Sequence, residues 1–182
     1  MSARAEIRGV CNVLRILGWG AVAVLLMLPL VAMQFTDEVN WTAEDFIAAG
    51  VMLGGAGLGT EFLVRQSSSH AYRAGAVFAV LAAFLTVWAN LAVGMIGNEG
   101  NPYNLLVGGV IVTGLLGMIL ARFQPAGMSV AMVVTAVAQA AVGALGISAD
   151  RLGGVLSMAF AGPWLLAAAL FWYAAREQLP AR

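Results

Sequence analysis

Among the carboxylates of this sequence, Glu61 alone lies inside one of its long apolar stretches rather than at the end of one. An ionised side chain is costly in hydrocarbon, so such a residue marks a proton or ion path by default. Arg65 follows four residues later, in the order that favours an ion pair on one face of a helix. The sequence therefore allows two interpretations of Glu61: an ion pair at the inner membrane interface, or a proton or cation relay at the cytoplasmic mouth of a path.

Uncharged polar side chains also interrupt the apolar stretches. Asn90 belongs to a stripe at helical spacing that includes Thr86, and Gln139 lies in the middle of a later stretch. Such amides usually form hydrogen bonds between helices, and this is the preferred interpretation here. They are also the residues that would line a polar path. The candidates for a transport path are Glu61, Thr86, Asn90, Thr113 and Gln139.

A short connector at 35–46, FTDEVNWTAEDF, holds four of the nine carboxylates. Its second half has the pattern of a helix start, because Thr42 can cap a helix whose first turn would contain Glu44 and Asp45. Capping does not explain the first half. A second connector, NEGNPYN, resembles it when Glu38 is aligned with Glu99. The candidate outer cluster is Asp37, Glu38, Asn40, Glu99 and Asn101, which either gathers a hard cation such as calcium or is solvated loop charge.

Composition excludes several kinds of chemistry. All nine basic residues are arginine, so the chain can offer neither a Schiff-base lysine nor the lysine of a phosphate-binding loop. One cysteine and one histidine leave no CxxC motif and no bis-histidine site within the chain. With zero net charge, there is also no basic field to attract nucleic acid. We expect a protein without a resident cofactor, without a nucleic-acid partner and without enzyme activity.

The elements that position these residues are membrane spans. Hydrophobic residues make up 62% of the chain and charged residues 10%, far from the roughly 25% charge of a soluble domain. A transmembrane helix needs about 20 mainly apolar residues. The sequence predicts an all-α integral membrane bundle of six transmembrane helices forming one domain over 1–182, with an uncleaved first span. The expected spans are 13–35, 45–64, 72–97, 104–121, 127–148 and 153–175.

The arginines predict the orientation of the spans. If both termini are cytoplasmic, every arginine except Arg151 falls on the inner side, as the positive-inside rule requires. The acidic connector and NEGNPYN then face outward. The inner arginines are Arg4, Arg8, Arg15, Arg65, Arg73, Arg122, Arg176 and Arg182.

Small residues at four-residue spacing predict close helix packing, since small side chains let two backbones approach. The predicted packing residues are Gly50, Gly54, Gly55 and Gly59 in the second span, and Ala136, Ala140 and Ala144 in the fifth. They serve either the bundle itself or a homo-oligomer. The Gly162-Pro163 pair predicts a kink or break in the sixth span. The likeness of the two outer connectors also predicts helical-hairpin repeats, with spans one and two matching spans three and four.

Two segments, 28–46 and 88–102, resemble parts of small polytopic membrane proteins of proteobacteria. The resemblance extends through Tyr72-Arg-Ala-Gly and Ala121-Arg-Phe. The group has no established activity, so the resemblance implies a bacterial inner-membrane location and no site residues. Two functions remain in view: a small transporter or channel for an ion or solute, which the intramembrane Glu61 favours narrowly, and a non-catalytic subunit that packs against itself or a larger membrane complex.

Overall fold

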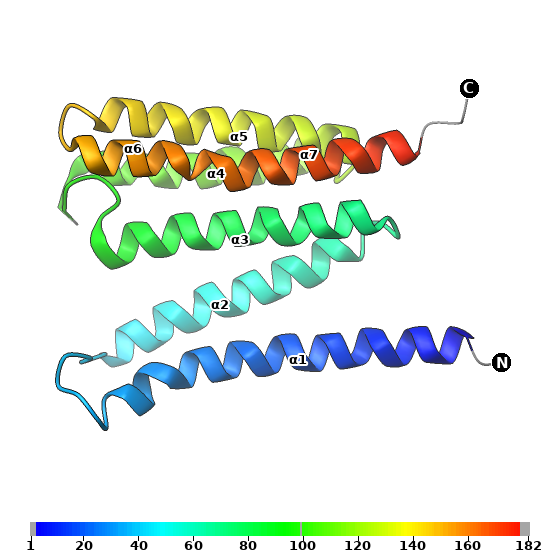
Figure 1. Ribbon diagram of the computed structural model, residues 1–182, viewed down its shortest axis with the longest axis horizontal. Coiled ribbons are helices and arrows are strands. Elements are labelled where there is room, and N and C mark those ends of the chain that lie inside the picture. Colours follow the sequence, from blue (N-terminus) through cyan, green and yellow to red (C-terminus); the bar gives the residue numbers. More distant parts are fainter. Residues whose placement is uncertain (1–2, 99, 179–182) are drawn as a thin grey trace. The chain divides into compact units, whose positions relative to one another are not determined.

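The computed structural model describes residues 3–98 and 100–178, and every regular element in these ranges is a helix (Figure 1). Six helices are long and apolar enough to cross a membrane, counting η1 with α4 and α6 with α7. The chain is an all-α, multi-pass membrane protein, which confirms the predicted fold class. The elements are α1 (Ala3–Ala32), α2 (Ala43–Val64), α3 (His70–Val93), η1 (Pro102–Asn104), α4 (Leu105–Leu120), α5 (Pro125–Gly146), α6 (Arg151–Ala159) and α7 (Ala161–Glu177).

Two of the predicted spans extend too far at their carboxyl ends. Helix α1 ends at Ala32, and a turn follows in which the Gln34 amide donates to the Val31 carbonyl at 3.0 Å. Helix α3 ends at Val93 because Gly94 adopts a φ of 66°, a left-handed conformation that stops a helix. Apolar composition continues past both ends, so hydropathy alone places these boundaries three to four residues too late.

The chain divides into two compact units, residues 1–59 and residues 60–182. The first unit contains α1 and most of α2, where a Cβ on Gly57 would lie 3.3 Å from the Trp19 ring. The second unit contains the last turn of α2 and all the later helices. The expectation of one transmembrane domain over 1–182 stays a prediction.

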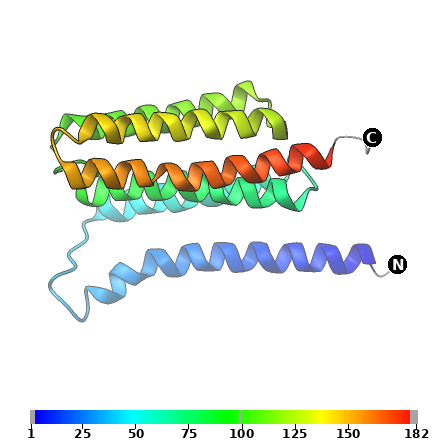
Figure 2. The same cartoon turned by 45° about the horizontal axis from the view of Figure 1, so that its top comes forward.

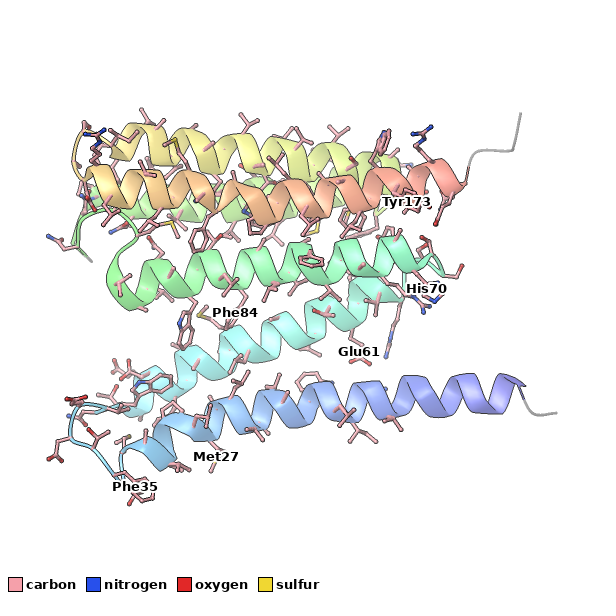
Figure 3. The ribbon with its side chains drawn as sticks, in the orientation of Figure 1. Met27, Phe35, Glu61, His70, Phe84 and Tyr173 are labelled. Carbon is pink, nitrogen blue, oxygen red and sulfur yellow. The ribbon has the colours of Figure 1, made fainter. Side chains whose placement is uncertain are left out.

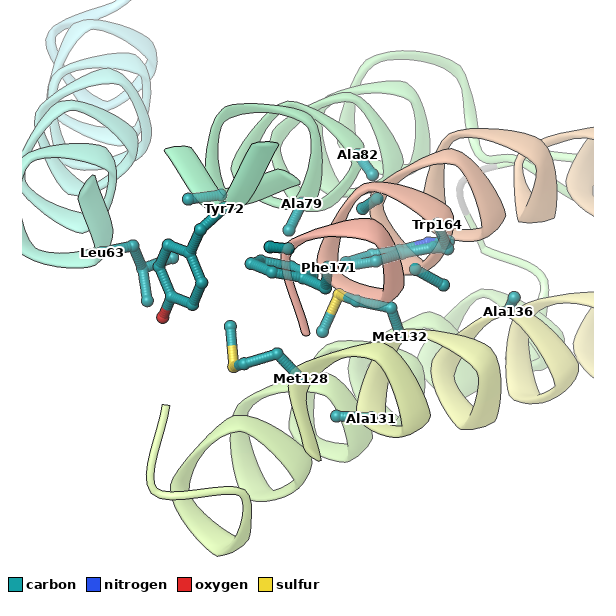
Figure 4. Close-up of a cluster of buried hydrophobic side chains, with 14 of the residues drawn as sticks. Leu63, Tyr72, Ala79, Ala82, Met128, Ala131, Met132, Ala136, Trp164 and Phe171 are labelled. Carbon is teal, nitrogen blue, oxygen red and sulfur yellow. The ribbon is translucent and has the colours of Figure 1, made fainter. Parts of the chain in front are cut away.

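In the second unit, α5 contacts α4, α6 and α7, and α3 packs along α7 (Figure 2). Apolar side chains fill the space between α3, α5 and α7 (Figure 4). The largest of them are fully or almost fully buried. They are Tyr72, Met128, Met132, Trp164 and Phe171.

The predicted interruption of the sixth span is confirmed. Helix α6 ends at Ala159 and α7 begins at Ala161, with Phe160 between them. Pro163 lies four residues after Ala159. It has no N–H to donate to the Ala159 carbonyl, and its ring crowds that carbonyl, so the helical bonding pattern cannot continue unchanged through this turn.

A close backbone approach in the second unit joins Gly143 of α5 to Gly154 of α6. A Cβ on Gly143 would lie 2.6 Å from the Gly154 carbonyl oxygen, and a Cβ on Gly154 would lie 2.7 Å from the Gly143 oxygen. Glycine at both positions is therefore required by the contact itself.

The small residues singled out from spacing lie in varied surroundings. Ala136 is buried in the core cluster and Ala140 packs against it, as predicted for bundle packing, whereas Ala144 is exposed. Gly50 would place a Cβ 4.0 Å from Leu26, and Gly59 is half-buried. A Cβ on Gly54 or Gly55 would meet nothing within 4 Å. The Gly54–Gly55 surface of α2 is thus open within the first unit.

Candidate functional site

The acidic connector ends in a complete helix N-cap. The Thr42 amide donates to Asp45 Oδ2 at 2.7 Å, and the Asp45 amide donates to Thr42 Oγ1 at 3.4 Å, which is the reciprocal arrangement of a capping box. Trp41 and Phe46 close the same turn with an edge-to-face ring contact at 5.2 Å between centroids. The prediction that Thr42 caps α2 is confirmed. Asp45 therefore has a structural function in this connector.

The remaining described residues of the outer cluster divide between the two units. Asp37, Glu38 and Asn40 are exposed in the first unit. In the second unit the Asn101 side chain caps η1, accepting from the Tyr103 amide at 3.0 Å. Glu99 and Arg182 lie outside the described residues, as do the side chains of Arg4 and Arg8. Among the described residues, no three His, Cys, Asp or Glu side chains are grouped to hold a metal ion.

Glu61 and Arg65 form an ion pair along the last turns of α2, with Arg65 Nη2 donating to Glu61 Oε1 at 2.5 Å. The Arg65 side chain is 64% exposed, whereas that of Glu61 is 18% exposed. Figure 3 shows Glu61 near the end of α2 that leads into α3 at His70. Of the two interpretations of Glu61, the ion pair is present in the structure; a relay function stays a prediction.

Gln139 occupies the centre of the most polar part of the core. It is fully buried, and its Nε2 donates to the Ser157 carbonyl at 3.1 Å and lies 3.0 Å from Ser157 Oγ. The same nitrogen lies 3.7 Å from Met95 Sδ. These bonds join α5 to α6 and to the segment that follows α3. The preferred interpretation of Gln139 as a tie between helices is confirmed.

Asn90 makes a second tie between elements. Its Nδ2 donates to the Asn104 carbonyl at 3.3 Å. Buried Asn104 in turn fixes the connector after α3: its Oδ1 accepts from the Ile96 amide at 2.9 Å, and its Nδ2 donates to the Asn98 carbonyl at 2.7 Å. Asp150 holds the same connector from the other side by accepting from the Gly97 amide at 3.0 Å, while it also caps α6.

We call Thr86, Asn90, Asn104, Gln139 and Ser157 the buried polar layer. Three polar atoms of this layer have no hydrogen-bond partner among the described residues: Thr86 Oγ1, Asn90 Oδ1 and Gln139 Oε1. The indole nitrogen of Trp164, Nε1, is also without one. A buried polar atom without a hydrogen bond costs about 1–3 kcal/mol. Thr113 differs, because its Oγ1 donates to the Gly109 carbonyl of its own helix at 2.8 Å.

Apolar side chains lie between this layer and the opposite end of the second unit. Tyr72 and Phe171 meet edge to face with centroids 5.0 Å apart, and Met128 and Met132 pack against them (Figure 4). The Tyr72 hydroxyl donates to the Phe123 carbonyl at 2.9 Å in the turn between α4 and α5. Asn90 and Gln139 therefore border an apolar plug and tie separate elements together.

Three residues of this region were not among the sequence candidates: Asn104, Ser157 and Asp150. Ser157 had a readable signal, because it continues a small-residue stripe from Gly153 to Ala161 at helical spacing. Asn104 reads as a turn residue, and its bonds to Ile96 and Asn98 depend on the path of the connector. Asp150 precedes a helix start, which is the usual position of a capping residue.

Comparisons with known proteins add no family. No protein-family model matches the chain, and neither a curated protein nor a solved structure is significantly similar to it.

Proposed function

We propose that this protein is a non-catalytic structural or accessory subunit of a membrane assembly. It would pack against a second copy of itself or against a larger membrane complex. The observation that carries the proposal is the use of Gln139, the mid-span amide of α5, to bind Ser157 of α6. A side chain that lined a path would have its donors free for a passing solute, whereas this one donates to a fixed carbonyl. The apolar plug below it supports the same conclusion.

The surface of α2 supports association with a second copy. Within the first unit nothing packs closely on Gly54 or Gly55, so another helix could approach the α2 backbone there. Close approach of this kind drives helix association in lipid, where no hydrophobic force acts between helices. We therefore take a homo-oligomer formed through α2 as the first partner to test.

We also propose that the protein lies in a bacterial inner membrane with both termini in the cytoplasm. The alternating helices support this topology. Arg73 at the start of α3, Arg122 after α4 and Arg176 in the last turn of α7 belong to the same end of the second unit, whereas Arg151 begins α6 at the other end. A positive end of this kind faces the cytoplasm in multi-pass proteins.

Self-association is tested by counting subunits in lipid. Singly labelled full-length protein, reconstituted into vesicles at low density, is followed by photobleaching steps. We expect two or more steps per particle for the native chain, and mainly one step for Gly55→Leu, whose side chain would block the approach to α2. Val112→Leu is the control, because Val112 is an exposed residue of another helix, α4. Single steps for the native chain would remove the homo-oligomer.

A transporter or channel for a small ion or solute is the second candidate, favoured by the unpaired Asn90 and Gln139 oxygens. Dye-reported ion flux in vesicles separates the two. The accessory function predicts flux equal to that of protein-free vesicles. Flux that depends on the protein and is lost in Gln139→Leu would instead establish a path through the buried polar layer.

A further inference from the structure

The amide orientations in the buried polar layer are fixed by their own bonds. Asn90 and Gln139 each donate through nitrogen to a backbone carbonyl, which can only accept. Their carbonyl oxygens must therefore face away from those partners. Both oxygens are buried and have no hydrogen-bond partner among the described residues.

The packing register places the unpaired atoms near one another along the bundle. One close contact sets α3 against α7, where Gly75 meets the Phe171 ring, and a second joins Gly153 of α6 to the Met95 carbonyl in the connector just after α3. Antiparallel α-helices have the same rise per residue, so residues counted from the Gly75–Phe171 contact lie at matching heights. Asn90 then lies close to the level of Ser157, which is bonded to Gln139.

Thr86 lies about one turn further along the same core. It lies close to the level of Ala161 by the same register, and the Trp164 side chain points back toward this level because helical side chains tilt toward the amino terminus. Figure 4 shows the Trp164 indole beside Phe171 within the core cluster. Thr86 and Trp164 are 0% and 3% exposed, so neither residue is open to the surface of the second unit.

The chemistry of the four atoms specifies what would satisfy them. Two amide oxygens accept, the Trp164 indole N–H only donates, and the Thr86 hydroxyl can do either. A bare cation would satisfy the oxygens but repel the indole N–H. A small neutral molecule that both donates and accepts suits the set, and water is the molecule that fills such sites in proteins.

We propose that the buried polar layer is a hydrated site, in which ordered water binds Asn90 Oδ1, Gln139 Oε1, Thr86 Oγ1 and Trp164 Nε1. Hydrogen bonds join the layer through Asn104 to the carbonyl of the exposed Asn98. The apolar plug closes the other end. The site is independent of whether the chain is an accessory subunit.

Water-edited solid-state NMR on the full chain in phosphatidylethanolamine–phosphatidylglycerol vesicles tests the site directly. The probe is the indole N–H signal of Trp164, assigned by its loss in Trp164→Phe. We expect magnetisation to pass from water to this indole in the native chain, and the transfer to be lost in Thr86→Val with Gln139→Leu. An absent transfer in the native chain, or a transfer that the double variant leaves unchanged, overturns the proposal.

A second measurement covers the case in which the double variant fails to fold. Thr86 and Thr135 are both fully buried, but the Thr135 hydroxyl already donates within its helix, to the Ala131 carbonyl at 2.8 Å. If water is bound, Thr86→Val removes a hydrogen bond and lowers the midpoint of denaturation more than Thr135→Val does. In a dry layer Thr86→Val removes an unsatisfied hydroxyl and raises the midpoint, which would contradict the site.

Discussion

Replacing Gly143 with alanine should separate α5 from α6. The new Cβ would lie 2.6 Å from the Gly154 carbonyl oxygen and 2.7 Å from the Met158 amide nitrogen, whereas ordinary contacts begin at 3.4 Å. The backbones must therefore part by about 0.8 Å, because neither atom belongs to a flexible side chain. The bonds from Gln139 to Ser157, one turn away, would lengthen as the helices move.

The expected cost follows from opposing terms. Overpacking costs about 1–3 kcal/mol, and a backbone clash belongs at the upper end of that range. Loss of the interhelical bonds adds roughly 1 kcal/mol or less. Alanine recovers about 1 kcal/mol of helix propensity relative to glycine. We expect a net loss of about 2–3 kcal/mol in the free energy of unfolding.

The assay is denaturation of the protein in mixed micelles, followed by circular dichroism, with Gly108→Ala as the matched control. Gly108 lies in α4, where a Cβ would meet nothing within 4 Å, so alanine there keeps the propensity gain without a clash. Equal stabilities of the two variants would refute the close approach of α5 to α6.

Four further changes test local features by the same denaturation assay. Thr42→Ala removes the cap that Asp45 completes and should cost about 1 kcal/mol; an unchanged midpoint would show that the capping box does not stabilise α2. Arg122→Gly should stabilise the fold by about 1 kcal/mol, because Arg122 has a φ of 49°, which glycine adopts without strain. Gly97→Ala should destabilise the fold, because Gly97 has a φ of 74°. The reverse order of stabilities would contradict these backbone conformations. Glu61→Gln should cost less than about 1 kcal/mol, as expected for a partly exposed helical ion pair, and a loss of several kcal/mol would refute that assignment.

Hydropathy was sufficient to predict the helical membrane architecture. A bilayer-spanning helix must satisfy its backbone hydrogen bonds within its own segment, so each span is a long apolar run in the sequence. The break near Pro163 and the cap at Thr42 were equally readable, since each depends on a few neighbouring residues. The boundaries at Ala32 and Val93 were not, because turns here are as apolar as the helices they end.

Contacts between helices could not be derived in the same way. Gln139 was a clear candidate for a tie, yet its partner Ser157 depends on the register of α5 against α6. Glycine is abundant, at 22 residues, and spacing alone favoured Gly54 and Gly55 over Gly143 and Gly154, a pair that does make a close contact. Which small residues meet is decided by how whole helices pack, and local spacing does not encode that.

A double-mutant cycle on Gln139→Leu and Ser157→Ala tests the central claim most directly, which is that the mid-membrane amide of α5 binds helices together. The measured quantity is the free energy of unfolding of the native chain, both single variants and the double variant. We predict a favourable coupling of roughly 1 kcal/mol, the size found for hydrogen bonds between membrane helices. Strictly additive effects would contradict a bond from Gln139 to the Ser157 hydroxyl. The bond to the Ser157 backbone carbonyl survives in Ser157→Ala, so a Gln139→Leu variant as stable as the native chain would contradict the claim as a whole.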